Sequence, residues 1–270
     1  MPMRSTPSTP ALHGRYRWTL FKLVAVSLVE GMLLLLVVFS VSQAVWEDRL
    51  VDRVVVIAEV DPATESDHER ALAIMSSVHR VLRPRLETLG PGGAVRPAPM
   101  ESTDSHIQVP AGYCGSFSHV LARALQRAGI DAKLAQMLVG DVWGGHIVVA
   151  ALIGGRWVAL DPLYDVAFRG ADGSLLGFEE LQREWESVKD QCPPDYDHRY
   201  RYEGVRFTNW SRIPFGQSLF GGSEVSLRSH FLNLHWWYAL VGLVGLAIGG
   251  LLLFRQWRAV SRQFGSGAAA

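Results

Sequence analysis

The sequence is poor in cysteine, with only Cys114 and Cys192 among its 270 residues. Two cysteines cannot form the framework of a disulfide-rich domain. They also cannot complete a structural zinc site without two further ligands, and no Cys/His pair has the spacing of such a site. Each cysteine therefore has to be interpreted from its own surroundings.

The sequence also lacks an excess of charge of either sign. Lys and Arg together number 26, Asp and Glu together number 26, and the formal net charge is zero. A domain that binds nucleic acid usually carries a clustered basic face. We therefore expect no nucleic-acid partner.

What the sequence does contain is two long apolar runs, Leu23–Val45 and Trp236–Phe254. A transmembrane helix needs roughly 20 apolar residues. The first run is longer than the core of a secretory signal peptide, which has roughly 7–15 residues. Residues 42–44 (Ser-Gln-Ala) are similar to a cleavage site, but the length of the run favours an uncleaved membrane anchor.

Basic residues flank both runs on their outer sides. They are Arg4, Arg15 and Arg17 before the first run, and Arg255, Arg258 and Arg262 after the second. Positively charged flanks stay in the cytoplasm, so we expect both termini to be cytoplasmic, in a bacterial inner membrane, with the central domain in the periplasm.

The predicted organisation has five segments. They are a disordered cytoplasmic tail (1–18), a transmembrane helix (19–45), an extracytoplasmic domain (46–234), a second transmembrane helix (235–255) and a cytoplasmic tail (256–270).

Three residues within the apolar runs are candidates for contacts with the lipid-embedded parts of other subunits. Gly245 and Gly249 form a GxxxG step, which allows close approach of helices, although it also fits a flexible glycine-rich helix. Glu30 is an ionisable group inside a membrane span, where such groups are costly and usually face protein. Two interpretations stay open: Glu30 is neutral and hydrogen-bonded to a small polar group, or it is paired with another chain.

The central domain has the pattern of an α+β fold, with a helix packed on an antiparallel sheet between the two transmembrane helices. One helix is predicted to start around residues 62–67 and to end or break at Pro84, because proline disrupts a helix interior. A second helix follows Cys114, with Gly129 as its C-terminal cap. Strands are then predicted around residues 132–138, 146–153 and 156–161.

The turn between the last two strands predicts which side chains lie together. With Gly154-Gly155 as a two-residue hairpin loop, Val148 lies opposite Asp161. Alternate residues of a strand share a face, so His146 lies diagonally next to Asp161, at about 7–8 Å between backbones. The pattern predicts an imidazole paired with a carboxylate.

Cys114 is placed at the start of a helix, behind a segment rich in proline and glycine. The positive end of a helix dipole favours a thiolate, and a nucleophile with a base and an orienting group is the minimum for covalent acyl transfer. The alternative is an inert buried thiol beside an ordinary strand histidine. Cys192 lies in a turn and is interpreted as a free thiol or, alternatively, as a redox partner of Cys114.

These motifs resemble the transglutaminase-like superfamily over roughly residues 65–185. The segments that carry the resemblance are Gly112–Phe117, Gly129–Lys133, Gly145-His146 and Gly155–Asp165. The resemblance implies a papain-like fold in which Cys114 is the nucleophile, His146 the general base and acid, and Asp161 the group that orients His146. It implies acyl transfer or hydrolysis at an amide of a peptide or protein substrate, with no metal and no organic cofactor.

Departures from the family pattern leave the substrate open. Aliphatic residues follow His146, where many members have an aromatic and an acidic residue, and the side-chain oxyanion donor could be Gln108 or Gln136. The leading hypothesis is a membrane-anchored cysteine acyltransferase, amidase or peptidase acting on the cell envelope. The rival is a non-catalytic subunit that docks onto a larger membrane complex. The aromatic-rich stretch from Tyr196 to Trp210 could pack on the domain, line a groove or rest on the membrane.

Overall fold

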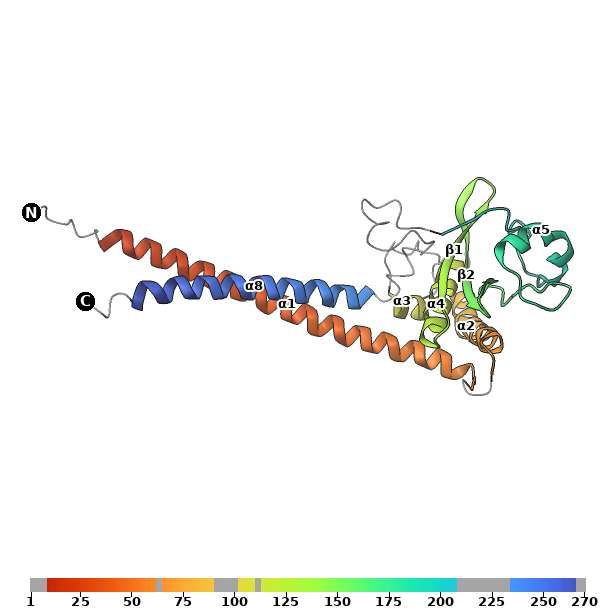
Figure 1. Cartoon of the computed structure of the whole chain (residues 1–270), viewed down its shortest axis with the longest axis horizontal. Coiled ribbons are helices and arrows are strands. Elements are labelled where there is room, and N and C mark those ends of the chain that lie inside the picture. The colour runs from red at the N-terminus through yellow and green to blue at the C-terminus, as the bar shows by residue number, and fades with distance from the viewer. Residues whose placement is uncertain (1–8, 62–64, 90–101, 110–112, 208–233, 266–270) are drawn as a thin grey trace, which may run out of the picture. The chain divides into compact units, whose positions relative to one another are not determined.

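The computed structural model describes residues 9–61, 65–89, 102–109, 113–207 and 234–265 (Figure 1). The chain divides into two compact units. Residues 1–44 and 235–270 form the helical unit, and residues 45–234 form the globular unit.

The helical unit contains most of two helices that are long and apolar enough to cross a membrane, α1 (Thr9–Ile57) and α8 (Leu234–Gly265). Residues 45–57 of α1 belong to the globular unit. Both helices exceed the predicted spans. Helix α1 starts at Thr9, within the segment predicted to be a disordered tail, and it continues to Ile57 rather than ending at residue 45. An apolar run marks the stretch that suits a bilayer, whereas polar residues on either side can prolong the same helix.

Glycines bring α8 close to α1. A Cβ atom on Gly242 would lie 2.6 Å from Val37 Cγ2, and one on Gly245 would lie 2.9 Å from Leu33 Cδ1. Real Cβ atoms essentially never show such distances. The helices therefore pack at a separation that only glycine allows, as the GxxxG step predicts for its first residue.

Glu30 lies against the second glycine of that step. Its carboxyl oxygen Oε1 occupies the position that a Cβ atom on Gly249 would need. Among the described residues, this buried oxygen has no hydrogen-bond partner. The structure thus offers Glu30 no small polar partner among these residues, and pairing with another chain stays a prediction.

After the end of α1, the globular unit continues with α2 (Asp67–Leu89). Ser66 and Glu69 form a reciprocal cap, because Ser66 N donates to Glu69 Oε2 (2.9 Å) and Glu69 N donates to Ser66 Oγ (3.3 Å). The prediction that Pro84 ends this helix is wrong: Pro84 lies inside it. The helix continues to Leu89 although Pro84 offers no N–H to the carbonyl of Arg80, and Thr88 Oγ1 donates to Pro84 O at 2.8 Å in the turn that follows.

The rest of the globular unit confirms the α+β class. Helices α3 (Thr103–Gln108) and α4 (Cys114–Arg127) precede the strands β1 (Ala132–Val139), β2 (Val142–Ile153) and β3 (Arg156–Leu160), and α5 (Phe178–Val188), a short 3-10 turn (Lys189–Gln191) and β4 (Val205–Arg206) follow. The four strands form an antiparallel sheet in the order β3-β2-β1-β4. Gly129 has φ +82°, as expected of a C-terminal cap after α4.

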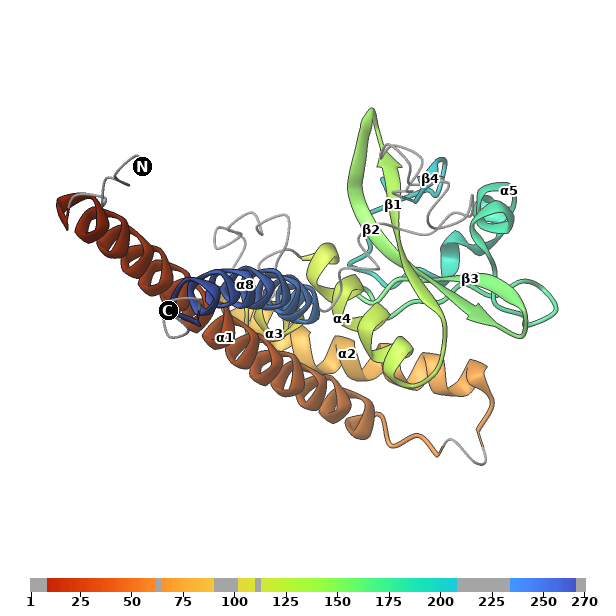
Figure 2. The same cartoon turned by 60° about the vertical axis from the view of Figure 1, so that its left-hand side comes forward.

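Each face of this sheet carries its own apolar core. Helices α2 and α4 cover one face, and α5 lies on the other (Figures 1 and 2). Alternation along the strands separates the two sets: Leu134 and Val149 belong to the first core, whereas Ala135 and Val148 belong to the second.

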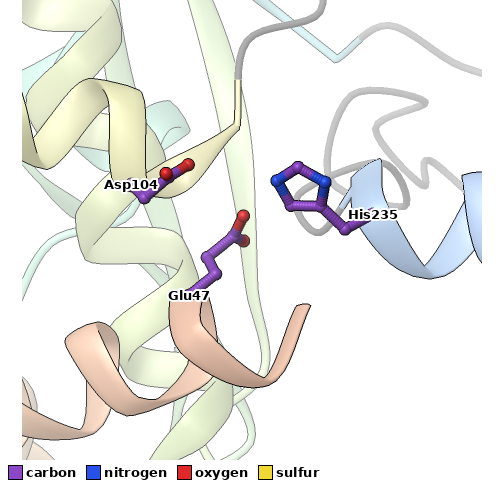
Figure 3. A group of neighbouring side chains, drawn as sticks. All are labelled: Glu47, Asp104 and His235. Atoms are coloured by element: carbon purple, nitrogen blue, oxygen red, sulfur yellow. The ribbon is translucent and has the colours of Figure 1, made fainter. Parts of the chain in front are cut away.

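The C-terminal part of α1 belongs to the globular unit. Val51 and Val54 are 0% and 3% exposed, and both are part of the first core. Ser77 Oγ of α2 donates to Val54 O at 2.8 Å. Glu47 is fully buried, and its carboxyl group lies within 4.8 Å of that of Asp104 on α3 (Figure 3).

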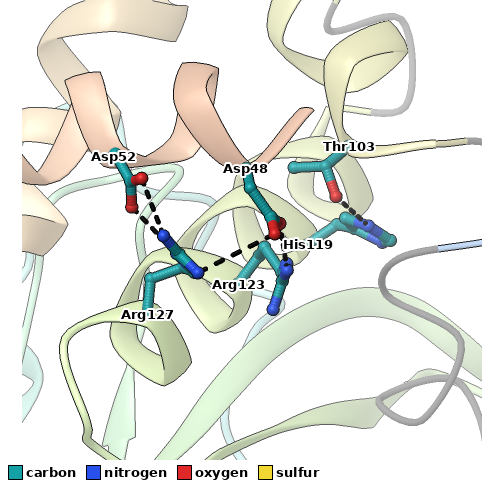
Figure 4. Close-up of polar contacts among 6 residues, drawn as sticks. All are labelled: Asp48, Asp52, Thr103, His119, Arg123 and Arg127. Carbon is teal, nitrogen blue, oxygen red and sulfur yellow. Dashed lines mark hydrogen bonds and ion pairs between the residues drawn. The ribbon is translucent and has the colours of Figure 1, made fainter. Parts of the chain in front are cut away.

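Ion pairs fix the same part of α1 to α4 (Figure 4). Arg127 binds Asp52 with two hydrogen bonds, of 2.8 Å from Nε and 2.7 Å from Nη2. Arg123 binds Asp48 one turn earlier. Apolar contact and charge therefore both hold the end of α1 on the helix that starts at Cys114.

Candidate active site

Cys114 is the first residue of α4 and is partly exposed. Tyr113 precedes it with φ 45° and ψ −119°, a backbone conformation that is strained for a residue with a side chain. The first helical hydrogen bonds run from Ser116 N and Phe117 N to Tyr113 O. The N–H groups of Cys114 and Gly115 precede those bonds, in the position where a helix N-terminus can bind an anion.

His146 lies on β2, and Asp161 directly follows β3. The pairing Ile153↔Arg156 continues to Val149↔Leu160, which is the register that the Gly154-Gly155 turn predicts. Both glycines have positive φ, 59° and 78°, as a type I′ turn requires. The predicted diagonal contact is present.

The two side chains are directly bonded and out of contact with solvent. His146 Nε2 donates to Asp161 Oδ2 at 2.7 Å, and both side chains are 0% exposed. The other carboxylate oxygen, Oδ1, accepts from Leu163 N at 3.2 Å. Asp161 is thus held on both oxygens, and it fixes the imidazole with the proton on Nε2, since an ionised carboxylate can only accept.

This environment favours the charged form of His146. Burial alone lowers the pKa of a histidine, but Asp161 and then Cys114 outweigh it and raise the pKa of His146 to about 10. A raised pKa means that the imidazole holds a proton firmly. A ring in this setting can accept the proton of a thiol and keep it.

The second ring nitrogen is the one available to the thiol. His146 Nδ1 is buried and has no hydrogen-bond partner by distance and angle among the described residues. The Cys114 side chain nevertheless interacts with the ring strongly enough to contribute to the raised pKa of His146. Because Nε2 is bound to Asp161, Nδ1 is the atom that can exchange a proton with Cys114.

Two contacts hold α4 against the strand that carries His146. Ser118 Oγ of α4 donates to Ile147 O at 2.7 Å. A Cβ atom on Gly115 would lie 3.6 Å from Ile147 Cδ1, an ordinary packing distance. The helix and the strand are therefore in direct contact at the residues next to Cys114 and His146.

Tyrosines surround the His146–Asp161 pair, and the sequence pattern did not assign them to the site. The Tyr200 ring is stacked on the imidazole, with centroids 4.0 Å apart and planes 4° apart. Tyr164 lies on another side, at 6.1 Å and 52°. Tyr196 and Tyr202 are buried in the second core. The described part of the aromatic-rich stretch thus packs on the domain, whereas Trp210 lies outside the described residues.

The other predicted candidates lie in different settings. Gln136 Oε1 accepts from Arg206 Nε at 3.1 Å, and Gln108 is the exposed last residue of α3. Cys114 and Cys192 are both free thiols. Burial, with Asp161 and Asp190 nearby, raises the pKa of Cys192 to about 11, so this thiol stays protonated at neutral pH.

A buried polar network joins α3 to α4. Thr103 Oγ1 and His119 Nε2 are 3.1 Å apart (Figure 4), and His106 Nδ1 and Ser116 Oγ are 3.0 Å apart. The two imidazole rings are in contact, with centroids 4.5 Å apart. His119 thus joins α4 to α3 through Thr103 and His106. The Glu47–Asp104 carboxyl pair nearby supplies fewer ligands than a hard cation needs by itself.

Comparison with known families agrees with this geometry. Residues 56–162 match the family model of the transglutaminase-like superfamily. The chain therefore contains a transglutaminase-like domain, and the match includes all three residues of the predicted triad. It begins before the range of the resemblance and ends earlier, directly after Asp161. The comparisons with curated proteins and with solved structures found no match.

Proposed function

We propose that this chain is a membrane-anchored cysteine acyltransferase, amidase or peptidase that acts on a peptide or protein of the bacterial cell envelope. The observation that carries the proposal is the fully buried 2.7 Å bond between His146 Nε2 and Asp161 Oδ2, on a ring that also interacts with Cys114. A nucleophile, a base and an orienting carboxylate are the elements of covalent acyl transfer.

In the proposed reaction, His146 Nδ1 takes the proton of the Cys114 thiol, and the sulfur attacks the carbonyl carbon of an amide. The carbonyl π bond breaks to give an oxyanion, which the N–H groups at the start of α4 can stabilise. Collapse of this intermediate breaks the C–N bond, and His146 returns the proton to the leaving amine. Water or a second amine then attacks the thioester and releases Cys114 as a thiol.

The proposed location follows from the two long apolar helices and their flanking charges. Arg15 and Arg17 stand before the first apolar run, and Arg255 and Arg258 stand after the second. Under the positive-inside rule both ends face the cytoplasm. The globular unit would then lie outside the inner membrane, where envelope peptides are within reach.

A second candidate function is a non-catalytic subunit of a larger membrane complex. The observation that favours it is Glu30, whose buried Oε1 has no hydrogen-bond partner among the described residues. A carboxyl group at such depth is usually satisfied by protein. A basic or polar group of another transmembrane chain would satisfy it.

The first experiment measures the alkylation rate of Cys114 against pH in the full-length chain, purified in detergent. Cys192→Ser is the background, and the key variant is His146→Ala. The matched control is His68→Ala, because His68 is a partly exposed histidine near the start of α2 in the same unit.

An active site predicts a fast labelling phase below pH 7 that disappears in His146→Ala and persists in His68→Ala. Slow labelling that is the same in all three proteins would contradict catalysis. The second candidate function would then predict transmembrane proteins that co-purify with the chain and are lost in Glu30→Gln.

A further inference from the structure

The segment from Cys192 to Tyr202, here called the tyrosine segment, lies outside the part of the chain that matches the family model. It is anchored on both sides of its midpoint. Tyr196 and Tyr202 are 3% and 1% exposed in the second core. Arg83 Nη2 of α2 binds Asp195 Oδ2 at 2.9 Å. The position of Tyr200 between these anchors is therefore determined by the fold.

Tyr200 places the face of its ring on the face of His146. The centroid distance of 4.0 Å and the angle of 4° describe nearly parallel rings in contact. The backbone carbonyl of Tyr200 accepts a hydrogen bond from Tyr196 Oη at 3.4 Å. That bond involves the main chain of residue 200, so the segment keeps it whichever side chain residue 200 carries.

The charge of the imidazole gives this stacking a chemical consequence. Asp161 and Cys114 raise the pKa of His146, so the ring becomes a stable cation once Nδ1 accepts a proton. A cation against the face of an aromatic ring is stabilised by the electron density of that face. Asp161 binds one edge of the imidazole, and Tyr200 covers one of its faces.

We propose that Tyr200 is a positioning residue of the candidate active site, whose ring fixes the plane of His146 and stabilises its protonated form. In the proton transfer, the S–H bond of Cys114 breaks and an N–H bond forms at His146 Nδ1, which leaves a thiolate beside an imidazolium. Tyr200 stabilises the imidazolium side of this transfer without exchanging a proton. The inference rests on the proposed function.

The other groups near His146 do not stabilise its protonated ring in the way that the stacked Tyr200 ring does. Besides Asp161 and Cys114, Asp197 also interacts with the imidazole. Arg199 binds Asp197 with a 2.6 Å ion pair, which offsets its charge. Tyr164 is tilted by 52° at 6.1 Å and does not stack on the ring.

The test titrates the imidazole of His146 by NMR in the full-length chain, labelled with ¹⁵N-histidine and assigned by loss of the signal in His146→Ala. Tyr200→Phe keeps the aromatic face, whereas Tyr200→Leu keeps apolar bulk without it. We expect the midpoint of His146 to fall by about 0.5–1.5 pH units in Tyr200→Leu. We expect it to change little in Tyr200→Phe.

A second measurement separates the aromatic face from simple packing and does not depend on the stability of Tyr200→Leu. Pentafluorophenylalanine at position 200 keeps the shape of phenylalanine but reverses the charge distribution of its face. It should lower the midpoint relative to Tyr200→Phe. Equal midpoints in these two proteins would overturn the inference, as would equal midpoints in Tyr200→Leu and Tyr200→Phe.

The two proposals fail in different ways. If the titration is unaffected by residue 200 while Cys114 still shows fast labelling that depends on His146, this inference is wrong and the proposed function stands. If Cys114 never shows that labelling, the proposed function is wrong, and a midpoint that falls with loss of the aromatic face still supports the stacking.

Discussion

The C-terminal part of α1 belongs to the globular unit, so substitutions in it should change the free energy of unfolding of that unit. Val54 is 3% exposed in the first core, whereas Val56, two residues later on the same helix, is 65% exposed. The substitution Val54→Ala removes two buried methyl groups and leaves a cavity. Val56→Ala removes the same atoms from solvent-exposed positions and is the matched control.

The expected cost follows from the burial. Each buried methyl group is worth roughly 0.8 kcal/mol, and the cavity adds a further term, so Val54→Ala should lower the free energy of unfolding by about 2 kcal/mol. In a domain of this size that corresponds to a fall of about 4–8 °C in Tm. Val56→Ala should change Tm by less than about 2 °C.

The assay is thermal unfolding of the fragment 45–234, followed by circular dichroism. A second fragment, 58–234, lacks Val51 and Val54 and leaves the Ser77 hydroxyl without its acceptor. We expect it to unfold without a cooperative transition. If 58–234 melts as cooperatively as 45–234, or if the two alanine variants are equally stable, the end of α1 is not part of the domain.

Two further predictions concern the helical unit and the pH dependence of stability. Gly242→Ala should destabilise the packing of α1 and α8 by about 1–3 kcal/mol, because the new methyl group would lie 2.6 Å from Cγ2 of the branched Val37 side chain; Gly250→Ala, whose methyl group meets nothing within 4 Å, should be neutral when thermal unfolding of the full-length chain is followed in detergent. The raised pKa of His146 stabilises the folded state fully below pH 6.5, the ordinary pKa of histidine, and this contribution is lost as pH rises toward about 10. The Tm difference between the wild type and Asp161→Asn should therefore be large at pH 6 and shrink by pH 10, and a constant difference would contradict the pairing.

The local parts of the site could be predicted from the sequence, because short-range rules determine them. The Gly154-Gly155 turn fixes the register of β2 on β3, and the register alone brings His146 next to Asp161. The start of α4 at Cys114 likewise follows from the glycine and proline before it and the helical pattern after it. Whether these residues act as a triad stays a prediction.

Two features of the helices differ from what the local sequence indicates, the continuation of α2 through Pro84 and the length of α1. Pro84 was expected to end α2, but a proline removes a single N–H, and the packing of the helix on both sides of it offsets that loss. Helix α1 continues past residue 45, where the predicted membrane span ends and charged residues begin. Asp48 and Asp52 bind arginines of α4, so the charged residues mark a change of packing partner rather than the end of the helix.

Tyr200 is the residue of the candidate site that no local rule could have found. It lies 54 positions after His146 in the sequence, and its place on the imidazole depends on how the tyrosine segment is anchored in the second core.

The alternation of side chains along β2 explains why the second core and His146 lie on the same face of the sheet. His146 and Val148 share a face, and Val148 belongs to the same core as Tyr196 and Tyr202. The residues that bury the second face of the sheet therefore also position the aromatic ring on His146, whereas Cys114 approaches from the helix that packs on the first face. Changes in either core should then affect the geometry between the thiol and the imidazole.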